Sequence, residues 1–177
     1  MQLVDKNGNV VDFQEIVQNV KSEAALAAER GDLYAWNAAT AAIDTTDCLI
    51  LLRNDDPGKL LYIETIWLGL DVPGVMHIHL PVSFTATDGT AITAVPMSTV
   101  SSSTPLYTAR ADNTDVETFA AARTIMSVRT NEVTTDIHGT EPVQFGGKLV
   151  LGYGKTVAVD IIGEPGAYTA TIIGYYK

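Results

Sequence analysis

The sequence predicts an all-β fold: an antiparallel β-sandwich or jelly roll of about eight to ten strands, preceded by an N-terminal hairpin and one amphipathic helix. Three observations predict it. From Leu33 onward, apolar residues alternate with period two, and Thr, Val, Ile and Tyr dominate. Turn signals rich in Gly, Pro and Asp separate these runs at intervals of about 10–15 residues. Only the first 30 residues contain a long helical pattern.

Length and composition limit the classes of function. The chain has 177 residues, of which 46% are apolar, so it suits one domain with a full core and is not wholly disordered. A net charge of −10 disfavours binding to nucleic acid or to an anionic membrane surface. One cysteine excludes a disulfide scaffold. Without a membrane-spanning run or a secretory signal pattern, we expect a soluble protein made in a cytoplasm.

The N-terminal segment is expected to form an arm over residues 1–30, followed by the sandwich domain over 31–177. Asn7-Gly8 lies between two short apolar runs and predicts a hairpin turn. Asp12 is placed to cap a helix over 13–30, with Glu15 completing a capping box. Gly31 is placed to end that helix in a left-handed conformation.

One side of the predicted helix is apolar. Its stripe consists of Phe13, Ile16, Val17, Val20, Ala24 and Ala27. A hairpin plus one helix has little core of its own, so the stripe must pack against something. Two interpretations stay open: the helix packs on its own domain, or it docks on a neighbouring subunit.

Period-two runs bounded by turn residues predict the strands of the sandwich. Several strands are apolar on both sides, as expected where the second side meets another chain. One example is 60–69, where Leu61, Ile63, Thr65 and Trp67 alternate with Tyr62, Glu64, Ile66 and Leu68. The predicted strands are 33–39, 46–53, 60–69, 75–86, 91–100, 117–128, 132–138, 144–151, 155–163 and 167–176.

Residues 101–116 are expected to form a long surface loop or extended arm. The stretch opens with Ser101-Ser102-Ser103-Thr104-Pro105 and closes with a polar run, with at most a short strand at 106–110. Loops of this length in a compact domain usually carry function.

His77 and His79 form the strongest candidate metal pair. Residues i and i+2 of a strand project to one side, so two imidazoles can share an ion, as in a cupin-like enzyme. The carboxylate that cupins place shortly after the second His is missing, since the next acid is Asp88. His138 is distant in sequence. The favoured interpretation is two histidines on a half-buried strand or at a subunit contact.

Other chemical candidates are weaker. Asp112, Asn113, Asp115 and Glu117 are oxygen ligands in one stretch, but they lack the EF-hand spacing, so a solvated acidic loop is favoured over calcium. Cys48 lies in an apolar strand and is expected to be a buried structural thiol. With no nucleophile motif or P-loop, we expect no enzyme, catalytic residues, cofactor or resident metal.

The two tryptophans bear on sugar binding. An exposed aromatic platform at Trp36 or Trp67 would favour a glycan-binding β-sandwich module. Both residues lie inside apolar strand patterns, however, so core packing is the expectation for both.

Several segments of the chain share a pattern with a known group of proteins. They are 31–36 (Gly31 to Trp36), 60–68 (Leu60, Tyr62, Ile63, Glu64, Ile66, Trp67, Leu68), 149–152 (Leu149, Leu151, Gly152), 157–160 (Val157, Val159, Asp160) and 172–176 (Ile172 to Tyr176). In the texture and order of these segments, residues 31–177 resemble small virion proteins of tailed phages. Such proteins are β-sandwich or jelly-roll modules; many decorate or cement the capsid, often as trimers, and others build fibres or tail parts. The resemblance therefore implies a capsid decoration protein on the outer capsid surface of the virion, with a phage tail or fibre module as the alternative.

We therefore expect partners among proteins: further copies of the chain, as a homo-oligomer such as a homotrimer, and the major capsid protein or another virion protein. No contact with nucleic acid or membrane is expected. The expected interface residues are Phe13, Ile16, Val17, Val20, Tyr107, Tyr175 and Tyr176, together with the 101–116 stretch.

Overall fold

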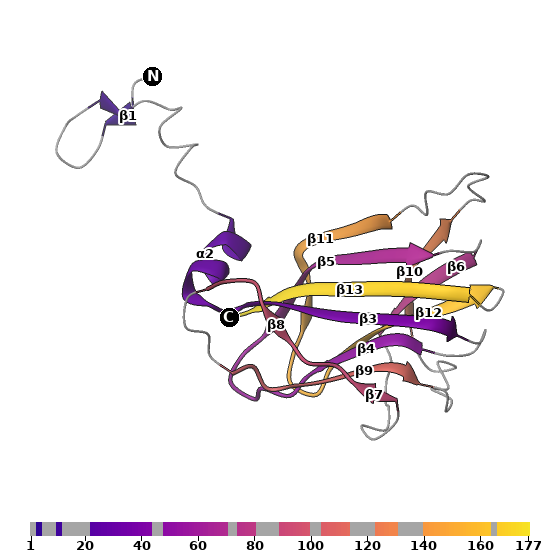
Figure 1. Cartoon of the computed structure of the whole chain (residues 1–177). Coiled ribbons are helices and arrows are strands. Elements are labelled where there is room, and N and C mark those ends of the chain that lie inside the picture. The colour runs from indigo at the N-terminus through magenta and orange to yellow at the C-terminus, as the bar shows by residue number, and fades with distance from the viewer. Residues whose placement is uncertain are drawn as a thin grey trace.

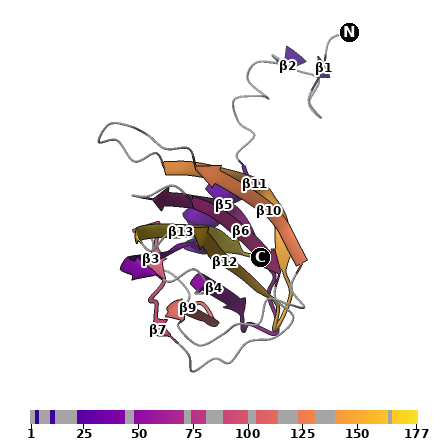
Figure 2. The same ribbon diagram turned by 90° about the vertical axis from the view of Figure 1, so that its right-hand side faces the viewer.

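The computed structural model describes residues 3–4, 10–11, 22–43, 48–70, 74–80, 89–99, 104–113, 123–130, 140–163 and 166–177. The fold is mostly β. Two antiparallel sheets, of five and six strands, pack as a sandwich, and a short helix, α2, lies at the end where β3 begins and β13 finishes (Figures 1 and 2). The predicted β-sandwich is therefore confirmed. No helix in the described ranges is long and apolar enough to cross a membrane.

The strands pair in a defined order within each sheet. The six-stranded sheet runs β10-β6-β12-β4-β9-β7, and the five-stranded sheet runs β11-β5-β13-β3-β8. β1 and β2 form the predicted N-terminal hairpin. The strand bounds are β1 Leu3–Val4, β2 Val10–Val11, β3 Leu33–Ile43, β4 Cys48–Asn54, β5 Leu61–Leu70, β6 Gly74–Leu80, β7 Thr90–Ala91, β8 Val95–Pro96, β9 Tyr107–Asn113, β10 Arg123–Thr130, β11 Thr140–Leu151, β12 Thr156–Gly163 and β13 Gly166–Tyr176.

Eight of the described strands have the connectivity of a jelly roll. β3, β5, β11 and β13 lie in the five-stranded sheet, and β4, β6, β10 and β12 lie in the other. Along these eight strands the chain changes sheet at every step except from β6 to β10. The resulting orders, 11-5-13-3 and 10-6-12-4, are those of two interlocked Greek keys.

The core fills the space between the two sheets. Alternate residues of the strands point inward, and burying each large side chain contributes about 1.5–3 kcal/mol. The largest fully buried side chains come from both sheets: Tyr34, Trp36, Leu49, Ile50, Leu51, Leu52, Leu61, Ile63, Ile66, Leu68 and Tyr168. Of these, all but Leu51 belong to the shared core between the sheets.

The helix α2, Glu23–Arg30, is shorter than the predicted helix over 13–30. Ser22 is extended and caps it, its side chain accepting a hydrogen bond from the Ala25 N–H at 3.1 Å, so no continuous helix runs from Asp12 to Arg30. The predicted cap at Asp12 lies outside the described residues. Gly31 ends the helix with φ 77°, as predicted.

The helix packs on its own domain, one of the two interpretations left open for the arm. Ala27 is fully buried, and α2 contacts β3 and β13. Lys177 Nζ also donates to Glu23 Oε2 at 3.0 Å, joining the helix to the C-terminus. Ala24 of the predicted apolar stripe is half-buried, and its residues from Phe13 to Val20 lie outside the described ranges. The division at residue 30 stays a prediction.

The segment predicted as a strand over 91–100 instead crosses between the sheets. β7 pairs with β9 in the six-stranded sheet, and β8 pairs with β3 in the five-stranded sheet. Within the predicted loop over 101–116, the short strand allowed at 106–110 is present and is longer than expected. β9, Tyr107–Asn113, pairs along its length with β4, because backbone groups beside a sheet edge are satisfied by extending the ladder.

A bulge in β5 changes which side chains face the core. Leu61 and Ile63 point inward, but so do Ile66 and Leu68, because the pairing with β13 skips Glu64. One extra residue reverses the alternation, so Trp67 is 41% exposed. The expectation of core packing is confirmed for Trp36 and wrong for Trp67.

Candidate functional site

Among the residues that the structure describes, a broad area on the outer side of the five-stranded sheet has no charged side chain. We call this area the uncharged face, and it comprises ten outward positions, all exposed or half-buried: Ala35, Asn37, Ala39, Thr65, Trp67, Pro142, Gln144, Thr169, Thr171 and Ile173. Glu64, at the bulge in β5, brings a carboxylate to the same side of the sheet and marks the limit of this area. The chain therefore presents here a neutral surface of mostly short side chains.

Trp67 lies in the middle row of the uncharged face. In the register of the sheet, Asn37 of β3 is opposite Thr171 of β13, Thr171 is opposite Trp67 of β5, and Trp67 is opposite Pro142 of β11. Thr171 donates a hydrogen bond to Asn37 Oδ1 at 3.0 Å. One row thus combines an aromatic surface with hydroxyl and amide groups.

A hollow of about 370 Å³ adjoins this row. It lies where β3 meets the crossing from β7 to β8, and Asn37 and Ala39 belong both to its lining and to the uncharged face. Thr90, Thr93 and Val95 line its other side. The described part of its lining has hydroxyl, amide and methyl groups and no charged side chain.

The outer side of the six-stranded sheet carries titratable residues instead. His77 and His79 of β6 project to the same side, and Asp160 of β12 is opposite His77 in the register. Asp160 Oδ1 lies 3.0 Å from His79 Nε2 and 3.6 Å from His77 Nδ1. The two imidazole rings meet edge to face at 5.6 Å. The fold thus supplies the carboxylate whose absence after His79 counted against a metal pair.

Neighbouring residues fix the surroundings of these three. Thr124 Oγ1 of β10 lies 3.1 Å from His79 Nδ1. Cys48, 1% exposed, donates its S–H to Ile50 O at 3.3 Å and to Val159 O at 3.5 Å, so the predicted buried thiol is confirmed. It forms a small apolar cluster with Leu51 and Ala158 on the side of the sheet away from the main core.

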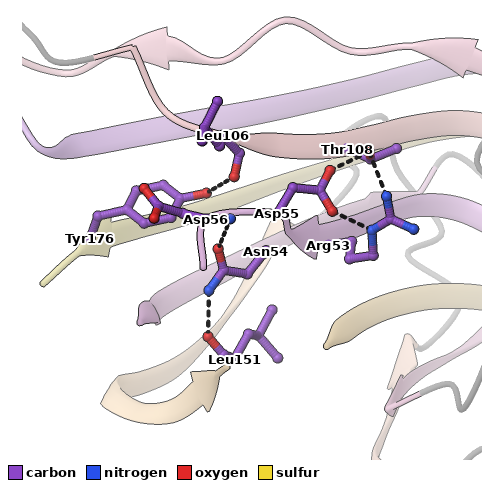
Figure 3. A network of polar contacts seen from close by, with 8 residues as sticks. All are labelled: Arg53, Asn54, Asp55, Asp56, Leu106, Thr108, Leu151 and Tyr176. Atoms are coloured by element: carbon purple, nitrogen blue, oxygen red, sulfur yellow. Dashed lines mark hydrogen bonds and ion pairs between the residues drawn. The ribbon is translucent and has the colours of Figure 1, made fainter. Parts of the chain in front are cut away.

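A polar network joins the two sheets at the end of the sandwich where β4 and β11 finish (Figure 3). Asn54 is fully buried. Its Nδ2 donates to Leu151 O and to Lys59 O, both at 2.9 Å, and its Oδ1 accepts from the Asp56 N–H at 2.9 Å. This buried amide stabilises the fold, since its N–H and C=O groups are hydrogen-bonded and each one left unpaired would cost about 1–3 kcal/mol.

The same end holds a buried tyrosine and an ion pair. Tyr176 donates its O–H to Leu106 O at 3.1 Å (Figure 3). Burial, followed by the nearby carboxylates of Asp56 and Asp55, raises the pKa of Tyr176 above its ordinary value. Arg53 pairs with Asp55, which also accepts a hydrogen bond from Thr108.

The three predicted interface tyrosines contact their own chain. Tyr176 and Tyr175 are only 2% and 4% exposed. Tyr175 stacks on Tyr62 with ring centroids 5.2 Å apart, and burial, followed by the Glu64 carboxylate, raises the pKa of Tyr175. Tyr107 is half-buried, packs edge to face on Trp36 and accepts the Ala94 N–H at 2.6 Å. These side chains therefore leave little surface for a partner.

Several sequence hypotheses fall on residues that the structure does not describe. Phe13, Ile16, Val17 and Val20 lie outside the described ranges, as do His138, Asp115 and Glu117. Asp112 and Asn113 lie in the backbone of β9. The calcium hypothesis and the arm interface therefore stay untested.

The sequence interpretation missed the uncharged face and Asp160. The run of outward Ala, Asn and Thr residues on β3 and β13 was a usable signal for the face. No local signal pointed to Asp160, because only pairing between distant strands brings it to His77. Comparisons with protein-family models, with curated proteins and with solved structures gave no match to the chain.

Proposed function

We propose that this chain is a structural subunit of a larger assembly, and specifically a decoration protein on the outer capsid surface of a tailed phage. The observation that carries the proposal is the uncharged face. A neutral area of short side chains on a rigid sheet is suited to close packing against another protein surface. The resemblance of residues 31–177 to phage virion proteins adds the specific assignment.

The mechanism would be burial of surface between neighbouring subunits. Each Å² of apolar area removed from water contributes about 25 cal/mol before the costs of association. Because the face carries no charge, no charge has to be desolvated when it is covered. The net charge of −10 favours a position facing away from packaged nucleic acid.

A charge placed in the uncharged face tests the proposal. Thr169, exposed on the central strand β13, is changed to Lys, and co-sedimentation with virion shells lacking the protein is measured together with self-association. We expect Thr169→Lys to weaken binding at least tenfold, since the partner would have to desolvate a lysine (about 1.4 kcal/mol per tenfold).

Ser127→Lys is the matched control, because Ser127 is also exposed but lies on β10, in the other sheet. It should bind as the unchanged chain does. A chain that stays monomeric at high concentration and does not sediment with shells would contradict the proposal. Equal binding by both variants would exclude the uncharged face as the contact.

A glycan-binding tail or fibre module is a second candidate, favoured by the exposure of Trp67. Sugar rings stack on aromatic side chains. Here Thr171 offers a hydroxyl next to the indole, and Asn37 and the adjoining hollow lie one strand further along the same row. A glycan array tests it: Trp67→Ala should abolish any binding, whereas Trp67→Phe should retain part of it. An array without hits counts against this candidate.

A further inference from the structure

The cluster of His77, His79 and Asp160 is separate from the uncharged face, because it lies on the outer side of the other sheet. Its three side chains come from adjacent strands and project to one side. They are largely covered, with side-chain exposures of 21% for His77, 6% for His79 and 15% for Asp160. Removing two imidazoles and a carboxylate from water is costly unless they interact with a partner.

The spacing of the ligand atoms is close to that of a metal centre. Nδ1 of His77, Nε2 of His79 and Oδ1 of Asp160 all lie within 4.8 Å of one another. Two ligands at about 2.0–2.1 Å from one zinc ion are about 2.9–3.4 Å apart. The two distances to Asp160, 3.0 and 3.6 Å, are already near that range. Rotation of the partly exposed His77 side chain can shorten the 3.6 Å distance from its Nδ1 to Asp160 Oδ1.

Thr124 holds His79 in a suitable orientation. Its hydroxyl can either donate to Nδ1 or accept from it, at 3.1 Å. When it accepts, the proton sits on Nδ1 and Nε2 presents its lone pair toward Asp160. Metal-binding histidines commonly have such a partner on the second ring nitrogen.

Asp160 provides the negative charge that an ion would need. Its Oδ1 is buried, and within the described part of the chain no donor is aligned with that atom for a hydrogen bond. A buried carboxylate oxygen is costly to leave without a compensating cation. Two imidazole nitrogens stand beside it, so a cation bound by all three would satisfy it.

We propose that His77, His79 and Asp160 bind one divalent transition-metal ion, with Zn²⁺ as the preferred ion. Two imidazoles and one carboxylate suit zinc and its neighbours, whereas Ca²⁺ and Mg²⁺ prefer oxygen ligands alone. Cys48 is no ligand, since its S–H is engaged by two backbone carbonyls. Three protein ligands leave a fourth position for water or for a group from a partner.

Binding would link β6 and β12 directly and β10 through Thr124. The ion would therefore hold these three strands together on the outer side of the six-stranded sheet. Because a preformed site binds metal in the folded state only, the ion should stabilise the fold. Binding should weaken in acid, since protonated imidazoles do not bind metal.

The test is calorimetric titration of the full, untagged chain with Zn²⁺ after removal of metal by a chelator. We expect one ion per chain and a rise in the thermal unfolding midpoint of about 5 °C or more at Zn²⁺ about 100 times the dissociation constant. Co²⁺ should give the visible absorption of a four- or five-coordinate site. His77→Ala and Asp160→Asn should each weaken binding at least tenfold.

Glu64→Gln is the matched control for Asp160→Asn, because it removes one carboxylate from the outer side of the other sheet, at the β5 bulge beyond the uncharged face. It should bind Zn²⁺ as the unchanged chain does. Circular dichroism of each variant without metal shows whether it folds. Zinc-induced shifts of the His77 and His79 ring signals in the unchanged chain give a readout that needs no variant. Absence of stoichiometric binding, or binding by Asp160→Asn equal to that of Glu64→Gln, would overturn the proposal.

Discussion

The two outer sides of the sandwich differ in burial. The five-stranded sheet has the ten exposed or half-buried positions of the uncharged face, whereas the titratable and apolar side chains on the outer side of the six-stranded sheet are largely buried. On the first, Thr169 and Trp67 face solvent. On the second, Leu51 and Ala158 are fully buried, and His79 is only 5% exposed. Both sides arise from strands with the same alternation. Alternation therefore determines which side chains point away from the core, and their neighbours on adjacent strands determine whether those side chains are exposed or buried.

An aspartate placed on each of the two outer sides should give the largest difference in stability. Leu51→Asp puts a carboxylate where no part of the side chain reaches water, and we expect a loss of about 4 kcal/mol or more in the free energy of unfolding. Thr169→Asp, on the uncharged face, should cost at most about 1 kcal/mol. Urea unfolding measures both. Equal losses would show that the two sides do not differ in burial.

Within the five-stranded sheet, the inner side should tolerate far less than the outer side. A Cβ added to Gly174 would lie 2.8 Å from the backbone oxygen of Tyr62, so β13 and β5 would have to separate. We expect Gly174→Ala to lower the free energy of unfolding by about 1–3 kcal/mol.

Gly152→Ala is the control for this prediction. An added Cβ there meets nothing within 4 Å, so the change should stay within about 0.5 kcal/mol. Thermal or urea unfolding of both variants provides the measurement. A Gly174→Ala chain as stable as Gly152→Ala would mean that the two strands are less tightly apposed than the structure has them.

The smallest effect concerns the polar network that joins the two sheets. Burial raises the pKa of Tyr176 from its ordinary value of 10.0, so the folded chain keeps this proton more tightly than the unfolded chain. The resulting stability is full below pH 10 and is lost as the pH rises toward the folded-state value. At neutral pH, Tyr176→Phe should cost about 1 kcal/mol, through the lost hydrogen bond to Leu106 O.

Urea midpoints measured from neutral pH to about pH 11 test this directly. The difference between Tyr176→Phe and the unchanged chain should shrink above about pH 10, because the variant has no phenol to ionise. Tyr153→Phe is the control, since Tyr153 is 66% exposed and should leave the alkaline profile unchanged. A constant difference at all pH values would contradict the raised pKa.

Local signals predicted much of the fold. Period-two runs located β3, β4, β5, β12 and β13 to within a few residues, and Gly31 marked the end of the helix. Trp36 and Cys48 were expected to be buried and are. The predicted continuous helix over 13–30 was wrong at Ser22, where an extended residue caps α2, because Ser is itself a good capping residue.

The candidate sites were less predictable. His77 and His79 were recognised as a pair because their spacing is local. Asp160 belongs to a strand far away in sequence, and the β12–β6 register alone places it beside them. Tyr175 and Tyr176 were expected at an interface, but the bulge and stacking around them fold both side chains into their own chain.

The sequence by itself determined the fold class, because β-branched alternation and turn residues act over a few neighbours. The tertiary structure decided the register of distant strands, since that depends on pairing across the whole sandwich. The bulge at Glu64 turned Trp67 outward, and the pairing of β12 with β6 joined Asp160 to two histidines. A shift of one residue in either strand reverses which side chains face the core, and no local pattern encodes such a shift.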